Sequence, residues 1–397
     1  MTPHLVDSCP LGAATTLAEL ADDPHARLAL LRAHEPVSWL PELGGWLVTR
    51  RDLALTVMRD SGTFTVDDPR FSTAQVVGPS MLSLDGDEHA RHREPFNAPF
   101  NAPFRPREVR EGFTVCIERE TDRLITALPS AGAAELRRAF AGPLAVAVVT
   151  EALGLTGTTA DTVLAWYDAI VRSVSDITAG HTAGPAGTAA YAQLRAAVEA
   201  TVADRDTASL LVSAAGHLTV PEVASNAAVL MFGGIETTEA MITNALLHLF
   251  RNPDQLALVR ADFDLLDGAI EESLRLEPGA AVVDRYATRD TVLGPAAIRR
   301  GDLVTVSLTG ANRDPDVFPD PDRFDVRRAN ARLQLAFAHG PHYCIAAHLA
   351  RLETRIALHR LLERLPALRL DPDHPVTPQG LVFRKPSTLH ALWGAPD

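Results

Sequence analysis

The sequence predicts a mainly α-helical protein with small β-sheets, folded as a single domain over residues 1–397. Two observations predict this class. From residue 111 onward, apolar residues recur at three- and four-residue spacing almost without interruption, which is typical of helices. Short alternating segments, typical of strands, occur in residues 1–80 and again near residues 290–307. No change in composition marks a linker between two domains.

The elements are expected in the following order. Residues 24–33 are helical, residues 36–49 alternate like a hairpin that turns at Gly44 and Gly45, and residues 51–59 are helical again. Further helices are expected at 111–128, 144–153, 160–174, 190–205, 221–250, 253–261, 265–276 and 345–365, and short strands at 290–293 and 303–307. The Gly-, Ala- and Thr-rich segment 178–187 lies between two helices, and we interpret it as a mobile lid loop.

Composition and charge exclude several functions. Hydrophobic residues make up 46% of the chain and charged residues 22%, a globular balance that excludes wholesale disorder. The formal net charge is −13, which disfavours a nucleic-acid binder because neutralising phosphates requires a basic face. The chain has a single lysine, Lys385, and its other basic residues are arginines. We interpret this ratio as the codon bias of a GC-rich bacterial genome.

Cysteine usage and the lack of targeting signals predict a cytoplasmic protein. Cys9, Cys116 and Cys344 are too few and too far apart for a disulfide framework. The N-terminus has no basic segment followed by an apolar one, so it does not resemble a signal peptide. The most apolar stretch, residues 227–250, is interrupted by charged and polar side chains, which disfavours a membrane span. We therefore predict a soluble protein with reduced thiols and no membrane partner.

One expected helix is unusually long. Thr219 and Glu222 form a capping-box pattern, and no strong stop follows for about 30 residues, or about 45 Å of helix. Its apolar centre predicts burial, yet it contains Gly233 and Gly234, each costing about 1 kcal/mol of helix stability relative to Ala. Polar residues beside the glycines indicate function. The alternative interpretation is a kinked helix in which a threonine bonds back to a carbonyl.

The segment FAHGPHYCIA, residues 337–346, places a cysteine where a Gly/Pro turn leads into the last helix. A cysteine at a helix N-terminus has its thiolate favoured by the helix dipole and by free backbone N–H groups. Three interpretations are open for Cys344: an inert buried thiol, a zinc ligand together with His339 and His342, or a thiolate ligand of haem iron. No CxxC or HExxH motif supports zinc.

Five ordered motifs between about residues 80 and 355 resemble those of the cytochrome P450 family. The segment 337–346 is similar to its cysteine-ligand loop, and GGIETT at 233–238 to its oxygen-activating helix segment. Glu272 and Arg275 match its Glu-x-x-Arg motif, and residues 311–328 match the meander that precedes the ligand loop. His89 and Arg93 resemble its His-x-x-x-Arg pair. The resemblance covers essentially the whole chain and implies the single-domain cytochrome P450 fold.

The resemblance implies a haem cofactor, haem b (iron protoporphyrin IX), with Cys344 as the axial ligand of its iron. A thiolate ligand directs electron density to the iron and favours O–O cleavage. The two haem propionates need cationic, hydrogen-bonding partners at the edge of an apolar slot. By resemblance these partners are His89, Arg93, Arg285 and His342.

The resemblance also implies a proton-delivery pair and a structural ion triad. Glu236 and Thr237 correspond to an acid–alcohol pair that delivers protons to bound dioxygen. Gly233 and Gly234 would let the helix backbone approach the dioxygen closely. The triad that locks the meander beneath the haem comprises Glu272, Arg275 and Arg328.

The chain departs from the family pattern at three places. Ala338 and Ala346 stand where the family usually has glycine, and each adds one methyl group to the ligand loop. Residues 95–104 contain a tandem Pro-Phe-Asn-Ala duplication that makes this segment four residues longer than usual. Because proline interrupts a helix, we expect the helix that carries His89 and Arg93 to end by about Glu94.

The implied activity is that of a haem-thiolate monooxygenase. It would insert one oxygen atom of O2 into a small apolar or aromatic substrate, or couple it oxidatively, in tailoring a bacterial natural product. No flavin or iron–sulfur segment is fused, so electrons from NAD(P)H would arrive through a separate ferredoxin or flavodoxin with its reductase. We expect a monomer whose docking arginines are Arg105, Arg107, Arg110, Arg332 and Arg351.

Other functions remain open at this point. The same fold can use hydrogen peroxide or reduce nitric oxide, although such relatives generally lack the acid–alcohol pair. A non-catalytic recruitment module on this fold would not need Cys344, and a zinc hydrolase would bind zinc in place of haem.

Overall fold

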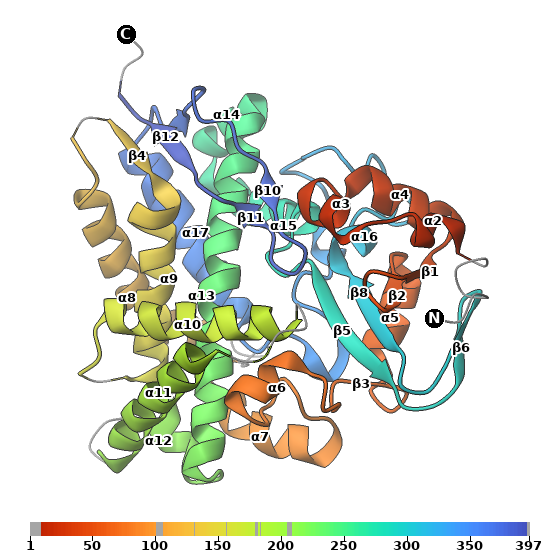
Figure 1. Ribbon diagram of the computed structural model, residues 1–397. Helices are drawn as coiled ribbons and strands as arrows, with labels where there is room; N and C mark the ends of the chain where they lie inside the picture. Colours follow the sequence, from red (N-terminus) through yellow and green to blue (C-terminus); the bar gives the residue numbers. More distant parts are fainter. Residues whose placement is uncertain are drawn as a thin grey trace.

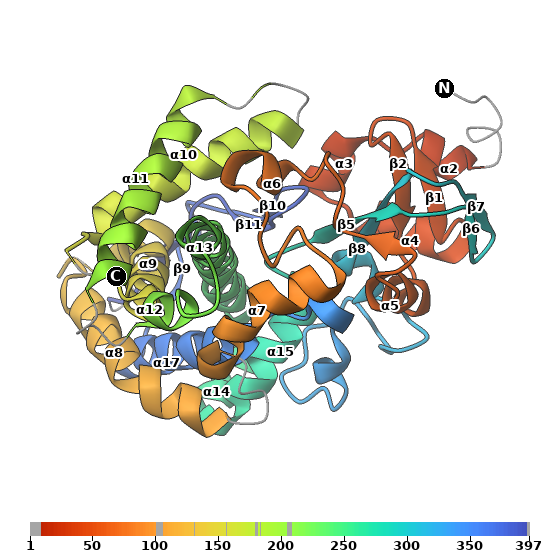
Figure 2. The ribbon, with the colours of Figure 1, turned by 90° about the horizontal axis from the view of Figure 1, so that it is seen from below.

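One long helix, α13 (Val220–Arg251), passes through the middle of the protein. The computed structural model describes residues 9–100, 106–130, 132–155, 157–178, 182, 184–204 and 209–394. Figure 1 shows α13 running from bottom to top, and Figure 2 shows it nearly end-on among the other helices. In its first turn the Thr219 amide donates a hydrogen bond of 2.8 Å to the Glu222 carboxylate. The prediction of a long, capped central helix is confirmed by its 32 residues.

Further helices surround α13 and form the larger part of the fold. Helix α13 packs against α9, α11, α15 and α17, and α8 packs against α17. No helix among the described residues is both long and apolar enough to cross a membrane. The bounds are α8 (Pro106–Thr126), η1 (Arg137–Ala141), α9 (Gly142–Leu153), α10 (Ala160–Thr178), α11 (Pro185–Ala203), α12 (Leu210–Ala214), α14 (Pro253–Ala261), η2 (Phe263–Leu265), α15 (Leu266–Leu276) and α17 (Ala347–Arg364).

A five-stranded sheet and its own short helices form the smaller part, on the right in Figure 1. The strand order is β1 (Val37–Leu40), β2 (Gly45–Val48), β8 (Leu303–Ser307), β5 (Val282–Ala287) and β3 (Phe64–Thr65). The antiparallel β1–β2 pair confirms the predicted hairpin, and β2 runs parallel to β8. The helices beside this sheet are α2 (Pro10–Ala13), α3 (Leu17–Asp22), α4 (His25–His34), α5 (Arg51–Arg59) and α16 (Leu308–Ala311), whereas α6 (Ser72–Val77) packs against α10 and α11.

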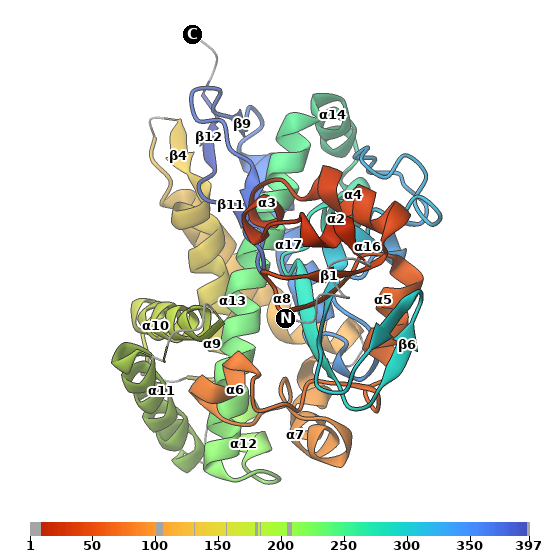
Figure 3. The same cartoon turned by 45° about the vertical axis from the view of Figure 1, so that its right-hand side comes forward.

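Three smaller sheets complete the fold. The hairpin of β10 (Pro378–Gln379) and β11 (Lys385–Pro386) lies against α13, as Figure 3 shows. The other two sheets comprise β4 (Ala133–Glu135), β12 (His390–Leu392) and β9 (Arg369–Leu370), and β6 (Thr291–Leu293) with β7 (Ala296–Ile298). Two short 3₁₀ turns, η3 (Ala331–Leu333) and η4 (Gly340–His342), precede α17.

The predicted end of the histidine-bearing helix near Glu94 is wrong. Helix α7 continues through Pro95 and spans Gly86–Phe100. A proline inside a helix costs about 3 kcal/mol, but Phe96 is fully buried, and burying a Phe side chain contributes about 1.5–3 kcal/mol. Tertiary packing therefore offsets the local penalty. The rest of the duplication, residues 101–104, lies outside the described residues, as does most of the predicted lid loop between Thr178 and Gly184.

Candidate functional site

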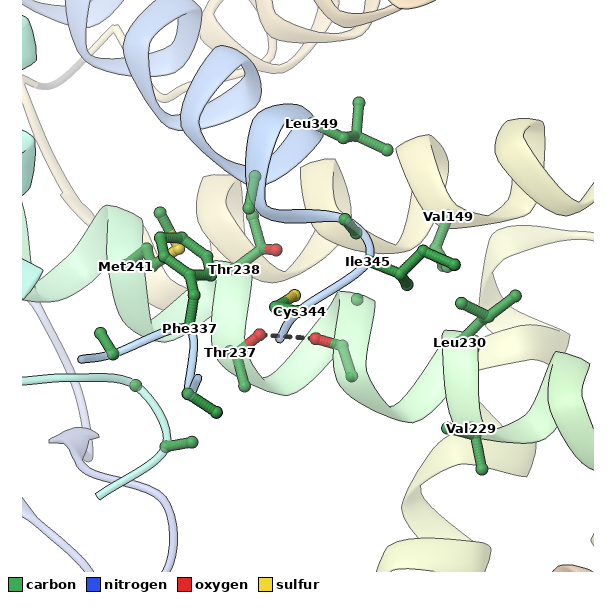
Figure 4. A pocket seen from close by; sticks show the side chains of 18 of the residues that line it. Val149, Val229, Leu230, Thr237, Thr238, Met241, Phe337, Cys344, Ile345 and Leu349 are labelled. Carbon is green, nitrogen blue, oxygen red and sulfur yellow. Dashed lines mark hydrogen bonds between the residues drawn. The ribbon is translucent and has the colours of Figure 1, made fainter. Parts of the chain in front are cut away.

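A cavity of about 250 Å³ lies where α13 passes the loop that precedes α17. Its lining is mainly apolar and comes from α9, α13, α15 and that loop (Figure 4). The prediction that the centre of α13 is buried all round needs correction here. Gly233 is exposed and lines the cavity, because α13 opens on this space instead of packing against a neighbour. Val229, Leu230 and Thr237 of the same helix also line the cavity, whereas Met231, Ile235 and Ala240 are buried in the core.

The loop before α17 is held in a tight conformation that directs Cys344 to the cavity. The Cys344 amide donates a hydrogen bond of 2.9 Å to the Phe337 carbonyl. Gly340 has φ +76°, and a Cβ there would lie 2.4 Å from the Met58 carbonyl oxygen, so only glycine fits. Figure 4 shows Cys344 and Phe337 opposite Thr237 of α13. The turn and the helix start predicted around this cysteine are both present, with α17 beginning at Ala347.

The environment of Cys344 raises the pKa of its thiol. Desolvation is the main cause, and it outweighs the opposing effects of the Ala346 backbone N–H and the Arg93 and Arg351 charges. The Ala346 N–H at the helix start does favour the thiolate, as expected from the sequence, but burial has the larger effect on the pKa. A metal ion bonded to the sulfur deprotonates such a thiol directly.

Ala338 adopts a backbone conformation that explains why glycine is usual at this position. Its φ is +58°, in the left-handed region that costs a non-glycine residue about 1–2 kcal/mol. We expect Ala338→Gly to raise the free energy of unfolding by about 0.5–1 kcal/mol, because relief of this strain exceeds the added unfolded-state entropy. Urea unfolding checks the change. Ala336→Gly, in the same loop at negative φ, is the control and is expected to destabilise.

Two arginines and two histidines gather at one edge of the cavity. The rings of His89 and His342 lie 4.4 Å apart between centroids, and Asp85 accepts a 2.9 Å hydrogen bond from Nε2 of His342. Burial, with the neighbouring His342 and Arg93, lowers the pKa of His89 to about 4. Burial also lowers the pKa of His342 and of the Arg93 and Arg285 guanidiniums. The structure thus brings together all four residues predicted to meet the propionates.

This edge is suited to an anionic ligand. Among the described residues, Arg93 donates only to the Tyr343 carbonyl, at 2.5 Å, and Arg285 only to the Asp284 carbonyl, at 2.7 Å. Neither guanidinium pairs with a carboxylate anywhere in the described part of the chain. His89 Nε2 is buried without a hydrogen-bond partner. Unpaired buried cations are costly unless a ligand supplies the negative charge, so a planar apolar group with two carboxylates, such as haem, fits these residues.

Thr237, Gly233 and Gly234 of α13 lie beside the cavity, and the two glycines have different surroundings. The Thr237 hydroxyl donates a 2.5 Å hydrogen bond to the Gly233 carbonyl, the back-bonding arrangement expected of a kinked helix. A Cβ on Gly233 would meet open space in the cavity, whereas a Cβ on Gly234 would lie 3.0 Å from Val149 of α9. Gly233 therefore keeps the cavity open beside Thr237, and Gly234 lets α13 pack closely against α9.

Glu236 lies outside the cavity lining, although it is adjacent to Thr237. Its carboxylate accepts a hydrogen bond from the Tyr167 hydroxyl and pairs with Lys385 Nζ at 2.6 Å. Lys385 also contacts Glu239. These partners come from α10 and β11, far from Glu236 in the sequence, and the sequence reasoning missed them. The one signal in the sequence that could have pointed to Lys385 is that it is the single lysine of the chain.

The three residues of the predicted triad are in contact. Glu272 and Arg275 are fully buried and pair at 2.7 Å, and Arg328 reaches the same carboxylate at 2.8 Å. Arg275 also donates to the carbonyls of Asn312, Pro321 and Arg323, all in the segment before the cysteine loop. The triad thus connects α15 with that segment, away from the cavity lining.

The alternative zinc interpretation lacks a ligand set. Within the described ranges, no three His, Cys, Asp or Glu side chains come close enough together to hold a metal ion. His339 lies in the cysteine loop but does not line the cavity.

A helical fold crossed by one long helix, with a partly buried cysteine facing it across an apolar cavity edged by arginines and histidines, is typical of the haem-thiolate class of proteins. Comparisons with known proteins agree. The family model described as Cytochrome P450 matches residues 188–391. The chain is 34% identical over its whole length to cytochrome P450 monooxygenase PikC of Streptomyces venezuelae, covering 94% of that protein.

Solved structures give the same result. The crystal structure of CalO2 matches with a TM-score of 0.85 at 29% identity, covering 95% of this chain and 97% of that one. The P450 enzyme CxnD, described as forming a C–S bond in chuangxinmycin biosynthesis, matches with a TM-score of 0.82 at 30% identity, covering 94% and 96%. The chain therefore belongs to the cytochrome P450 family and is an oxidoreductase of the cytochrome P450 monooxygenase class.

Proposed function

We propose that this protein binds haem b with Cys344 as the axial ligand and inserts one oxygen atom of O2 into a small apolar or aromatic molecule. One observation carries the proposal: a partly buried cysteine faces α13 across an apolar cavity, and at the cavity edge the guanidiniums of Arg93 and Arg285 have no carboxylate partner among the described residues. When bound, the haem iron supplies dioxygen activation and one-electron chemistry. The residues of the chain would bind and orient the haem and would deliver protons to the reacting oxygen.

The binding residues have separate tasks in this proposal. Arg93 and Arg285, with His89 and His342, hold the two propionates and thereby orient the macrocycle in the slot. Asp85 orients His342 by accepting its Nε2 hydrogen bond. The apolar side chains that line the cavity exclude water from the reacting face.

The proposed proton route uses Thr237 and Glu236. The Thr237 hydroxyl lines the cavity, and it can donate a proton while accepting another. Glu236 is the next residue on α13 and is 13% exposed, so it has access to solvent protons. The pair therefore supports use of O2 in preference to the peroxide-dependent alternative.

The substrate is proposed from the lining. The cavity walls include Met81, Leu82, Val229, Leu230 and Val283, and they carry no cluster of charge that would select a polyanion. The relative CxnD, whose printed description places it in a biosynthetic pathway, supports tailoring of a natural product as the context. Hydroxylation, epoxidation, nitration and oxidative coupling are all compatible with this lining.

The proposed electron source is NAD(P)H through a separate ferredoxin or flavodoxin with its reductase. Arg110 and Arg332 are exposed and remain candidates for docking an acidic partner. Arg351 is no longer a docking candidate, because its guanidinium pairs with Glu271 at 2.5 Å and lies 4.3 Å from the centroid of the Phe337 ring. The side chains of Arg105 and Arg107 lie outside the described residues.

Two measurements test the proposal. The purified protein should contain haem and, after reduction and addition of carbon monoxide, absorb at the red-shifted Soret position of the family. With a surrogate ferredoxin and reductase, it should then incorporate label from ¹⁸O2 into members of an apolar and aromatic compound library. A colourless protein that gains no Soret band with added haem contradicts the proposal, and label arriving only from peroxide favours the peroxide-using alternative.

Thr237→Ala is expected to keep haem and consume reductant while releasing more of it as hydrogen peroxide, because the cavity then lacks its hydroxyl donor. An increase of about tenfold in peroxide per product corresponds to about 1.4 kcal/mol of lost selectivity. Thr237→Ser, which keeps the hydroxyl, is the matched control. Glu236→Gln should slow turnover without loss of haem. Unchanged peroxide release in both Thr237→Ala and Glu236→Gln would contradict the assigned proton route.

A further inference from the structure

The single lysine of the chain lies beside the proposed proton-delivery acid. Lys385 is on β11 and its side chain is 11% exposed. Its ammonium lies 2.6 Å from Glu236 Oε1 and also contacts the Glu239 carboxylate. Glu239 is 7% exposed and pairs in turn with Arg137 Nε at 3.0 Å. Four charges of alternating sign therefore run from Arg137, at the surface end, to Glu236.

The residue spacing along the hairpin and along α13 places Lys385 opposite Glu236. Phe383 and Lys385 are two residues apart in extended chain, about 6.6 Å, and Phe232 and Glu236 are four residues apart on α13, about 6 Å. The two spacings match. Phe383 packs edge-on against Phe232 with 5.2 Å between the ring centroids, and Lys385 forms its ion pair with Glu236. Arg384, between them, points the other way and pairs with Glu277 at 3.1 Å.

Both oxygens of Glu236 are engaged, one by the β10–β11 hairpin and one by α10. Oε1 meets Lys385, and Oε2 accepts the Tyr167 hydroxyl hydrogen bond. Glu239 is held by two cations, Lys385 and Arg137. Glu236 is absent from the cavity lining while the adjacent Thr237 is part of it.

We propose that Lys385 is a positioning residue for proton delivery: its ammonium holds the Glu236 carboxylate on the hairpin side of α13, beside Thr237 and outside the cavity. This inference rests on the proposed function. Without the ammonium, Glu236 and Glu239 are like charges three residues apart on one helix face and repel each other. One of them must then reorient or take up a proton. The charged and titratable groups that face this site are Tyr167, Arg137, Glu236, Glu239 and Lys385.

The first test needs no catalysis, because Lys385 and the α-amine are the only primary amines of the chain. The purified protein is acetylated with N-acetoxysuccinimide, and mass spectrometry follows the labelling rate of Lys385 in folded and unfolded protein. Hydrogen bonds to charged groups imply protection of about tenfold or more in the folded protein. Glu236→Gln should reduce this protection, whereas Glu199→Gln, an exposed control, should not. Equal protection in wild type and Glu236→Gln overturns the proposal, whatever the enzyme does.

The second test separates positioning from a purely structural role. Lys385→Met should change the pH profile of NADPH turnover and of peroxide release with a surrogate ferredoxin and reductase, and Lys385→Arg should restore the wild-type profile. A wild-type profile in Lys385→Met, while Glu236→Gln still alters turnover, leaves the proposed function standing and removes the role of Lys385. A wild-type profile in both variants contradicts the proposed function itself. If Lys385→Met fails to fold, the pH profile is measured on Lys385→Gln instead, and the labelling of wild type and Glu236→Gln tests the contact independently.

Discussion

Glu272→Gln is expected to lower the free energy of unfolding by about 3–5 kcal/mol, the usual cost of removing one partner from a buried ion pair. Glu272 is fully buried, and its carboxylate accepts hydrogen bonds from both Arg275 and Arg328 as well as from the Asp325 amide at 3.1 Å. The neutral amide would leave two guanidiniums without a counter-charge. Urea unfolding of the purified protein measures the loss.

A matched control is the exposed pair Arg195–Glu199, whose carboxylate is 48% exposed. Glu199→Gln should cost no more than about 0.5 kcal/mol, because solvent screens a surface ion pair. Hydrogen exchange should also increase in residues 312–328 of Glu272→Gln, since Arg275 holds their carbonyls. Equal stability losses in Glu272→Gln and Glu199→Gln would show that the triad does not support the fold.

Cys344→Ser is expected to abolish the red-shifted Soret band of the reduced carbon-monoxide complex. The band depends on a thiolate ligand, and a serine oxygen in the same place donates far less electron density to iron. Cys344 lines the cavity and the other two described cysteines, Cys9 and Cys116, do not, so no other described thiol can take its place there. The spectrum of the reduced variant, with haem content measured separately, checks this result.

Cys116→Ser is the control for Cys344→Ser. Cys116 is buried on α8, does not line the cavity, and has a pKa raised to about 11 by burial and by nearby Glu151. This variant should keep the band at full intensity. Retention of the band in Cys344→Ser, or its loss in Cys116→Ser, would remove Cys344 from the axial position.

Some of the site could be predicted because its signals are local. Glu272 and Arg275 are three residues apart on one helix, so the motif itself places their side chains together. The Thr219 capping pattern likewise predicted where α13 begins. The Gly/Pro turn before Cys344 predicted a tight loop, and Gly340 has the positive φ that such a turn requires.

Local rules failed where packing outweighed them. Pro95 was expected to end its helix, but burial of Phe96 keeps α7 intact as far as Phe100. The apolar centre of α13 was expected to be buried, but at Gly233 it borders the cavity. The helix start was expected to favour a Cys344 thiolate, but burial has the larger effect on its pKa.

The sequence by itself determined the fold class, the order and approximate bounds of the main helices, and the residues that carry the family motifs, because these depend on periodicity and on neighbours along the chain. Only the tertiary structure decided which groups meet across long separations. Lys385 pairs with Glu236 across 149 positions, and Arg93 and Arg285 share an edge without carboxylate partners. Such contacts follow from how helices and hairpins pack, and no local periodicity encodes them.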